Sequence, residues 1–238
     1  TTFYCFTFFA FRVYYHGVPQ EAKNPPWDGG FVWRKDEMGR DYISVACEGD
    51  GCGLWWPLKD HISDEPDNGA SMTFTVPEDL YCVSNGRLIS TYQNPERNTK
   101  TYTWEVLSPI NNYNISVQLG NYVLLQDTVY RDNGNLETMN HYVLDYHKDV
   151  ASTVFPQARQ VIRFFEKYYG DYQFWNDGYK LVEVSYLGME HQSAVTYGNG
   201  FSIYNGVRSK SWPMYGVIDP LIIHETGHEW FGNSVTAS

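Results

Sequence analysis

The chain of 238 residues carries a formal net charge of −11 and a pI near 5.0, with 28 Asp and Glu against 17 Lys and Arg. This balance lacks the positive surplus that neutralises phosphates, so we expect no nucleic-acid partner. Apolar residues make up 42% and charged residues 19% of the chain, a composition typical of a folded rather than a disordered protein. The length predicts two domains, and the 17% content of aromatic residues favours β-structure.

The chain begins with an apolar segment, TTFYCFTFFAFRVYY, in which aromatic and β-branched residues predict a β-strand. Arg12 interrupts the segment before it reaches membrane-spanning length, so we expect no transmembrane segment in the chain. Neither a basic region nor a small-residue cleavage site precedes it. The compartment is therefore undetermined, with an exported or periplasmic location favoured over a cytoplasmic one.

Four cysteines, Cys5, Cys47, Cys52 and Cys82, are too few for a disulfide-rich scaffold and lack the CxxC spacing of a structural zinc site. We expect buried free thiols. A disulfide between Cys47 and Cys52 across a short loop is the alternative.

Residues 1–145 alternate short β-branched or aromatic runs with turn-forming residues, which predicts an antiparallel β-domain. The strand candidates are YISVAC, SMTFTV, YCVS, RLIST, TYTWEV, NISVQL and NYVLLQDTVY. In VSNGRLI, the pair Asn85-Gly86 predicts a hairpin, because these residue types accept the positive φ angles of a type I′ turn. The run from Asp132 to Gly134 predicts a second turn.

The pattern changes after residue 145, where we place the domain boundary, and residues 146–238 alternate helix, strand and helix. Residues 150–169 carry apolar side chains at helical spacing, namely Val154, Phe155, Ala158, Val161, Ile162, Phe165 and Tyr168. Ser152 or Thr153 is the expected cap of this helix. Pro156 falls in its first turn, and Gly170 ends it.

A helix with both ends marked is predicted in DPLIIHETGHEWFG, near the end of the chain. Asp219 is the expected N-cap and Pro220 the first helical residue, while Gly232 is the expected stop.

Two histidines on this helix form a candidate metal site. His224 and His228 are four residues apart, so both imidazoles project from one face and can bind one zinc ion. Glu225 lies beside them as a candidate general base, which is the logic of HExxH metallopeptidases. Glu229 points about 100° around the helix from His228 and is not expected to be a ligand. Two satisfied core histidines are the alternative interpretation.

The segment HETGHEWFGNSVT resembles the HExxHxWFGNxVT signature of the aminopeptidase N family, the gluzincin aminopeptidases, which are zinc exopeptidases. Upstream, YLGMEHQS resembles the Gly-x-Met-Glu-Asn motif, whose glutamate binds the free amino terminus of a peptide. The resemblance assigns this role to Glu190, beside Met189 and Gly188. Leu187 and His191 replace the first Gly and the final Asn of the motif, which places His191 next to the substrate.

Weaker similarities extend the resemblance over nearly the whole chain. WWPLKDHISDEP looks like the family's Phe-Pro-x-x-Asp-Glu-Pro landmark with a bacterial-type insertion, and VACE resembles the segment that contributes an acid to the substrate pocket, which nominates Glu48. The resemblance implies an α+β fold, with a saddle-like antiparallel β-sandwich in residues 1–145. The first part of a thermolysin-like catalytic domain would follow in residues 146–238.

The resemblance also implies ligands outside the chain. The family's third zinc ligand is a glutamate nineteen residues after the second histidine, and 228 + 19 = 247 lies beyond Ser238. A tyrosine that stabilises the tetrahedral intermediate is expected further on. We therefore expect the chain to be an inactive fragment of a metallo-aminopeptidase that binds one Zn²⁺ per full-length chain and acts on peptides with a free N-terminus.

Two other functions stay open at this stage. A non-catalytic peptide-binding or scaffold module would keep the fold and use its cleft for peptide amino termini. A thermolysin-like endopeptidase is disfavoured, because Glu190 would obstruct an extended peptide. The sequence does not determine the preferred amino-terminal residue or the oligomeric state.

Overall fold

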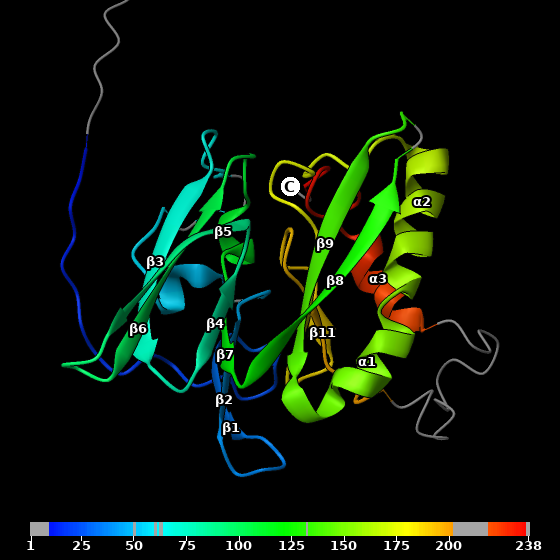
Figure 1. Cartoon of the computed structure of the whole chain (residues 1–238). Coiled ribbons are helices and arrows are strands. Elements are labelled where there is room, and N and C mark those ends of the chain that lie inside the picture. The colour runs from blue at the N-terminus through cyan, green and yellow to red at the C-terminus, as the bar shows by residue number, and fades with distance from the viewer. Residues whose placement is uncertain are drawn as a thin grey trace, which may run out of the picture.

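The computed structural model of the chain describes residues 10–49, 51–59, 61, 64–131, 133–201 and 219–236. Two lobes lie side by side, one built of strands and the other of strands with helices packed on them (Figure 1). Cys5 and most of the strand predicted at the start lie outside the described ranges. Residues 10–15 form no strand and are exposed, which corrects that part of the prediction. No helix in the described part is long and apolar enough to cross a membrane.

The first lobe is a β-sandwich of two antiparallel sheets. One sheet has the order β1 (Gly30–Lys35), β2 (Asp41–Ala46), β7 (Val117–Gly120) and β4 (Tyr81–Ser84). The other has the order β3 (Ala70–Pro77), β6 (Thr99–Val106) and β5 (Arg87–Asn94). Side chains from both sheets share one buried core, to which Val45, Val83 and Trp104 belong. The predicted β-sandwich is therefore confirmed. The strand expected in NISVQL begins only at β7, after the short helix η2 (Asn112–Asn114).

The predicted hairpin at Asn85-Gly86 is wrong. β4 pairs with β7 and β5 pairs with β6, so these two residues carry the chain from one sheet to the other. Asn85 is fully buried, and its side-chain amide donates to the carbonyl oxygens of Asn114 (2.9 Å) and Gln192 (2.7 Å). These partners are distant in sequence, so the side chain of Asn85 is used in tertiary contacts and not in a local turn. Of the two residues Asn85 and Gly86, Gly86 alone has a positive φ, of 75°.

We predict that Gly86→Ala is much more destabilising than Gly134→Ala, although both glycines have positive φ angles, of 75° and 86°. A Cβ on Gly86 would lie 1.9 Å from the carbonyl oxygen of Glu105, whereas nothing lies within 4 Å at Gly134. Left-handed backbone strain should cost Gly134→Ala about 1–2 kcal/mol. The added clash should bring Gly86→Ala to roughly 2–5 kcal/mol. Urea unfolding of the two variants tests this, and equal losses would contradict it.

The second lobe contains a five-stranded mixed sheet. Its order is β11 (Gly188–Met189), β12 (Val195–Tyr197), β10 (Leu181–Glu183), β9 (Leu136–Leu144) and β8 (Tyr122–Tyr130). The turn predicted between β8 and β9 is present, with the Gly134 N–H donating to the Arg131 carbonyl oxygen (2.9 Å), although Asp132 lies outside the described residues. β8 and β9 belong to this sheet although they precede residue 145. The domain boundary that was placed at residue 145 stays a prediction.

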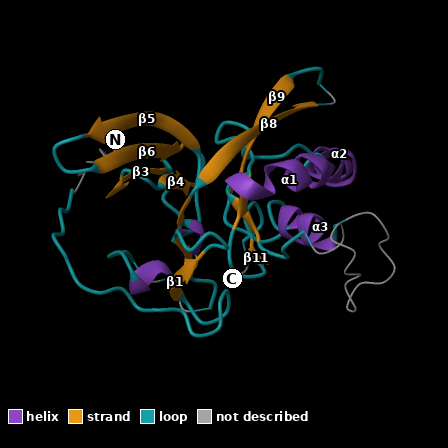
Figure 2. Cartoon of the chain, turned by 60° about the horizontal axis from the view of Figure 1, so that its bottom comes forward, coloured by secondary structure: helices purple, strands orange, loops and turns teal. Residues whose placement is uncertain are grey.

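Three helices pack on the side of this sheet that faces away from the sandwich (Figure 1). They are α1 (Lys148–Val154), α2 (Gln157–Tyr169) and α3 (Pro220–Gly227), and the short helix η3 (Asp145–His147) precedes them. Figure 2 shows all three on the same side of β8 and β9. Side chains from these helices and strands form a second buried core, separate from that of the sandwich.

The helix predicted over residues 150–169 is two helices. Pro156 divides them, because its ring blocks the carbonyl of Ser152 and it has no N–H to donate. The expected caps are also wrong, since the hydroxyls of Ser152 and Thr153 donate back to carbonyl oxygens inside α1. Gly170 ends α2 with a φ of 96°, as predicted. Tyr168 was expected in the core and is instead exposed at the end of α2.

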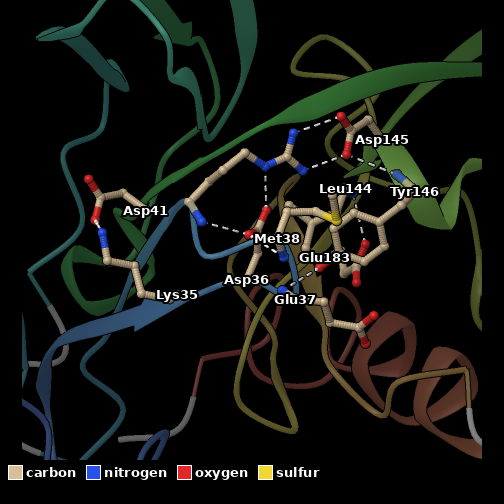
Figure 3. Close-up of polar contacts among 10 residues, drawn as sticks. Lys35, Asp36, Glu37, Met38, Asp41, Leu144, Asp145, Tyr146 and Glu183 are labelled. Atoms are coloured by element: carbon tan, nitrogen blue, oxygen red, sulfur yellow. Dashed lines mark hydrogen bonds and ion pairs between the residues drawn. The ribbon is translucent and has the colours of Figure 1, made fainter.

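A charged cluster joins the loop between β1 and β2 to the start of η3 (Figure 3). The guanidinium of Arg40 donates to both oxygens of Asp145, at 2.8 and 2.6 Å, and to Asp36 at 2.8 Å. The two hydrogen bonds from Arg40 lower the pKa of the Asp145 carboxyl. Next to it, the Leu144 N–H donates to Glu183 in β10 (2.8 Å). The end of β9 is therefore bound to both lobes.

Candidate metal and substrate site

Helix α3 begins as predicted. The Asp219 carboxylate accepts a hydrogen bond from the Leu221 N–H (3.0 Å), and Pro220 occupies the first turn. The helix ends at Gly227, five residues before the predicted stop at Gly232. The reason is local: beyond Gly227 the Glu229 N–H bonds to the Thr226 carbonyl oxygen three residues back, which tightens the chain into turns.

His224 in α3 and His228, the residue that follows the helix, point at a common position. The Nε2 atoms of His224 and His228 are 3.3 Å apart, and their rings are nearly perpendicular at 87°. Two nitrogens that each lie 2.0–2.1 Å from a tetrahedral zinc ion are about 3.3–3.4 Å apart. Ligand atoms of these histidines and Glu225 all lie within 4.8 Å of one another. The side chains present therefore fit a zinc ion.

The ring of His228 is oriented by the chain that follows α3. Its Nδ1 lies 3.0 Å from the carbonyl oxygen of Phe231, which can only accept a hydrogen bond. Nδ1 must therefore carry the proton, which leaves the lone pair of Nε2 directed toward His224. A metal-binding histidine is held in this way when its second nitrogen donates to a carbonyl. No sequence motif indicated this role for Phe231.

Glu225 is a buried carboxylate close to two others. Burial raises its pKa to about 9, with repulsion from Glu190 and Glu48 adding to the shift. A cation at the histidine pair would act in the opposite direction and favour the charged form. Gly188 lets β11 approach this side chain, because a Cβ there would lie 2.9 Å from a Glu225 carboxylate oxygen.

A pocket of about 420 Å³ lies beside the histidine pair. Its walls include Trp27, Glu48, Tyr113, Glu190, His228 and Phe231. The structure thus brings together Glu48, from the sandwich lobe, and Glu190 and His228, from the other lobe. These residues are far apart in the sequence, and the resemblance alone had grouped them.

Glu190 is buried and held from two sides. Its carboxylate accepts a hydrogen bond from the Tyr113 hydroxyl (3.1 Å), and its carbonyl oxygen accepts one from the side-chain amide of Asn233 (2.8 Å). The Asn233 side chain in turn accepts a hydrogen bond from Asn114 (2.7 Å). Asn233 belongs to the Trp-Phe-Gly-Asn signature and was recognisable on that ground. Tyr113 lies in η2 and carried no sequence signal.

Other predicted site residues do not line the pocket. Met189 is buried in a small core with Val32 and Tyr186. His191 is fully buried, neither ring nitrogen has a hydrogen-bond partner in the part of the chain that the structure describes, and burial lowers its pKa to about 3. It is therefore neutral near pH 7. Glu229 is buried away from the histidine pair, as expected.

Three cysteines lie within the described residues. Cys47, Cys52 and Cys82 are all buried, and none of them is in a disulfide. The prediction of buried thiols outside disulfides is confirmed for these three, and the alternative disulfide between the first two is not formed.

Comparison with known proteins finds proteins that are similar to this chain in sequence or in fold. The chain is 25% identical to human glutamyl aminopeptidase over 177 residues, which are 73% of the chain and 18% of that protein. In sequence the chain is therefore similar to a known aminopeptidase. An M1 zinc metallopeptidase from Deinococcus radiodurans has the same fold, with a TM-score of 0.70 at 18% identity, over 92% of the chain and 45% of that protein.

A second structure from the same organism, an M1 zinc metallopeptidase mutant bound to a Tyr-Ser-Ala substrate, matches equally well. Its TM-score is 0.70 at 17% identity, over 92% of this chain and 46% of that one. No family model matches the chain. The chain spans less than half the length of these M1 relatives. The fold predicted for it, a β-domain followed by the start of a catalytic domain, is the fold that these relatives share with it.

Proposed function

We propose that the complete protein is a zinc-dependent aminopeptidase that releases residues from the free amino terminus of peptides. The observation that carries the proposal is the 3.3 Å separation of the His224 and His228 Nε2 atoms, next to a pocket that contains Glu190. Human glutamyl aminopeptidase and the substrate-bound M1 structure support it as relatives.

In the proposed reaction, His224 and His228 would hold a zinc ion, and the chemistry that zinc would supply there is polarisation of the scissile carbonyl and increased acidity of water. Glu225 is placed to take the proton of the attacking water and deliver it to the leaving amine. To act as the base the carboxylate must be ionised, and a positive charge held by the histidine pair would offset the rise in its pKa that burial causes.

Glu190 would receive the α-ammonium group of the substrate, with Glu48 as a second carboxylate at the same pocket. A buried carboxylate that already accepts one hydrogen bond from Tyr113 retains lone pairs for an ammonium ion. Fixing the amine at one end of the pocket restricts cleavage to the first peptide bond. The specificity for amino termini would therefore depend on Glu190 and not on the metal.

We also propose that the chain of 238 residues binds zinc weakly by itself. Catalytic zinc normally has three protein ligands. Among the described residues, the group around the histidine pair contains only His224, Glu225 and His228, and Glu225 is assigned to the base. A further ligand is expected from the rest of the complete protein.

Zinc analysis and two matched substrates test the function. The full-length protein should bind one equivalent of zinc, and His228→Ala should lose most of it. The protein should hydrolyse alanine p-nitroanilide, and its N-acetylated form should be cleaved at least about 100-fold more slowly, since a charge-assisted hydrogen bond of about 3 kcal/mol would be lost. Equal cleavage of both would favour an endopeptidase. Zinc binding without cleavage, or neither, would favour the non-catalytic module.

A further inference from the structure

Residues 190–194 connect β11 to β12, and we call them the Glu190 loop. Ser193 lies near the end of this loop, and each of its polar groups is bonded to a different residue. Its N–H donates to a Glu229 carboxylate oxygen (2.8 Å), and its carbonyl oxygen accepts from the Lys180 ammonium (2.7 Å). Its hydroxyl accepts from the Gly86 N–H (2.8 Å). The residue has a φ of 59°, a left-handed conformation that serine rarely adopts without such support. These four residues form what we call the Ser193 anchor.

The anchor is removed from solvent. Ser193 is fully buried, and only 3% of Lys180 and 1% of Glu229 are exposed. The Lys180 ammonium also donates to the Gly86 carbonyl oxygen (2.6 Å) and lies over the ring of Trp104, with its Nζ 5.5 Å from the ring centroid. Buried polar groups are costly unless they are hydrogen-bonded. The lysine donates to two carbonyl oxygens and the glutamate accepts from the Ser193 N–H, so both side chains are held against the same serine.

The two ends of the Glu190 loop are tied to the same segment of chain. Glu229 holds Ser193 at one end, and Asn233 holds the Glu190 carbonyl oxygen at the other. Both residues follow His228 closely, so the bonds fix the loop relative to the histidine pair. Glu229 occupies the position that the HExxHxWFGN signature leaves free, and the signature therefore does not account for it.

We propose that Glu229 and Lys180 are positioning residues for the recognition of free amino termini. They hold Ser193 in its left-handed conformation and thereby set where the Glu190 carboxylate lies relative to His224 and His228. This proposal rests on the proposed aminopeptidase function. Neither residue contacts the pocket, so the effect on substrate passes through the loop.

Two matched hydroxamates separate this role from a general role in folding. Alanine hydroxamate carries a free α-amine, and its N-acetylated form does not, while both present the same metal-binding group. In the full-length protein, Glu229→Ala should raise Ki for alanine hydroxamate about tenfold, because the buried hydrogen bond that holds Ser193 is lost and the Ser193 N–H is left without its acceptor. Ki for the acetylated compound and the zinc content should stay unchanged. Glu229→Gln should restore the wild-type values, since its side-chain oxygen can still accept from Ser193.

Glu166→Ala is the matched control. Glu166 is also a buried glutamate of the second lobe, and its two hydrogen-bond donors, the Trp175 indole N–H (2.9 Å) and the Tyr172 N–H (3.3 Å), belong neither to the Glu190 loop nor to the Ser193 anchor. It should lower thermal stability without changing the ratio of the two Ki values. A parallel rise of both Ki values in Glu229→Ala, or no rise in either, would overturn the proposal.

Ser193→Ala provides a second variant if Glu229→Ala does not fold. It removes only the bond from Gly86 and should raise Ki for alanine hydroxamate alone, whereas an unchanged Ki would count against the proposal. Amide hydrogen exchange of residues 188–193 gives a readout that needs no activity. Exchange should be faster in either variant than in the wild type, and unchanged exchange would overturn the anchor. If the wild-type protein bound no zinc, or bound both hydroxamates equally well, the proposed function itself would be refuted.

Discussion

Replacing Glu225 by Gln in the full-length protein is expected to lower kcat by about 10²–10⁴-fold, because the amide cannot take a proton from water. The structure indicates that Gln can replace Glu225 without disturbing the fold. Glu225 is buried, with a pKa raised to about 9, so a neutral side chain of the same shape fits its surroundings. Hydrolysis of alanine p-nitroanilide measures the loss, and elemental analysis should still find one equivalent of zinc.

The zinc content decides how this result is interpreted. Loss of both zinc and activity would indicate that Glu225 holds the metal and is not the base. Undiminished hydrolysis by Glu225→Gln would refute the assignment of the base altogether. Glu166→Gln, a change of the same chemistry at another buried glutamate, should leave kcat unaltered.

Glu190→Gln is expected to reduce kcat/KM for free-amine substrates by about 100-fold, since a charge-assisted hydrogen bond to the ammonium is worth about 1.5–3 kcal/mol. The amide oxygen can still accept from the Tyr113 hydroxyl, so the loop should remain in place and the loss should report the missing charge. Slow cleavage of the N-acetylated substrate should not change. The ratio of the two kcat/KM values is the measurement.

Tyr113→Phe is the matched control for this prediction. It removes the hydrogen bond to the carboxylate and retains the charge, so we expect a smaller effect, about tenfold. A ratio of free to acetylated substrate that is unaltered by Glu190→Gln would show that another group binds the amine. Glu48, at the same pocket, would then be the first residue to test.

The elements of the fold that depend on local patterns were predictable from the sequence. The strands of the sandwich other than β1 followed from runs of β-branched and aromatic residues, and the start of α3 followed from Asp219 and Pro220. The break at Pro156 is also local, but it was not predicted, because Pro156 was placed in the first turn of a single helix. The passage of the chain from one sheet to the other at Asn85 could not be predicted from a local pattern, because the partners of that side chain lie in η2 and in the Glu190 loop.

The candidate site also contains some residues that a local pattern predicted and others that it did not. The spacing of His224 and His228 placed both rings on one helical face, and the structure shows their Nε2 atoms 3.3 Å apart. Glu190 was nominated only by resemblance to a motif. Tyr113 and Lys180 had no signal, because their importance comes from hydrogen bonds to residues far away in the sequence. Such contacts exist only once the lobes have packed together.

The hydrogen bond from Tyr113 to Glu190 joins the two lobes at the pocket beside the histidine pair. The sandwich is therefore more than a support for the second lobe, since it contributes Tyr113 and Glu48 to the wall of the pocket. A protein stripped of its first 120 residues would keep the helix with both histidines. It would lack Tyr113 and Glu48, and with them the part of the proposed amine-binding site that distinguishes the end of a peptide from its middle.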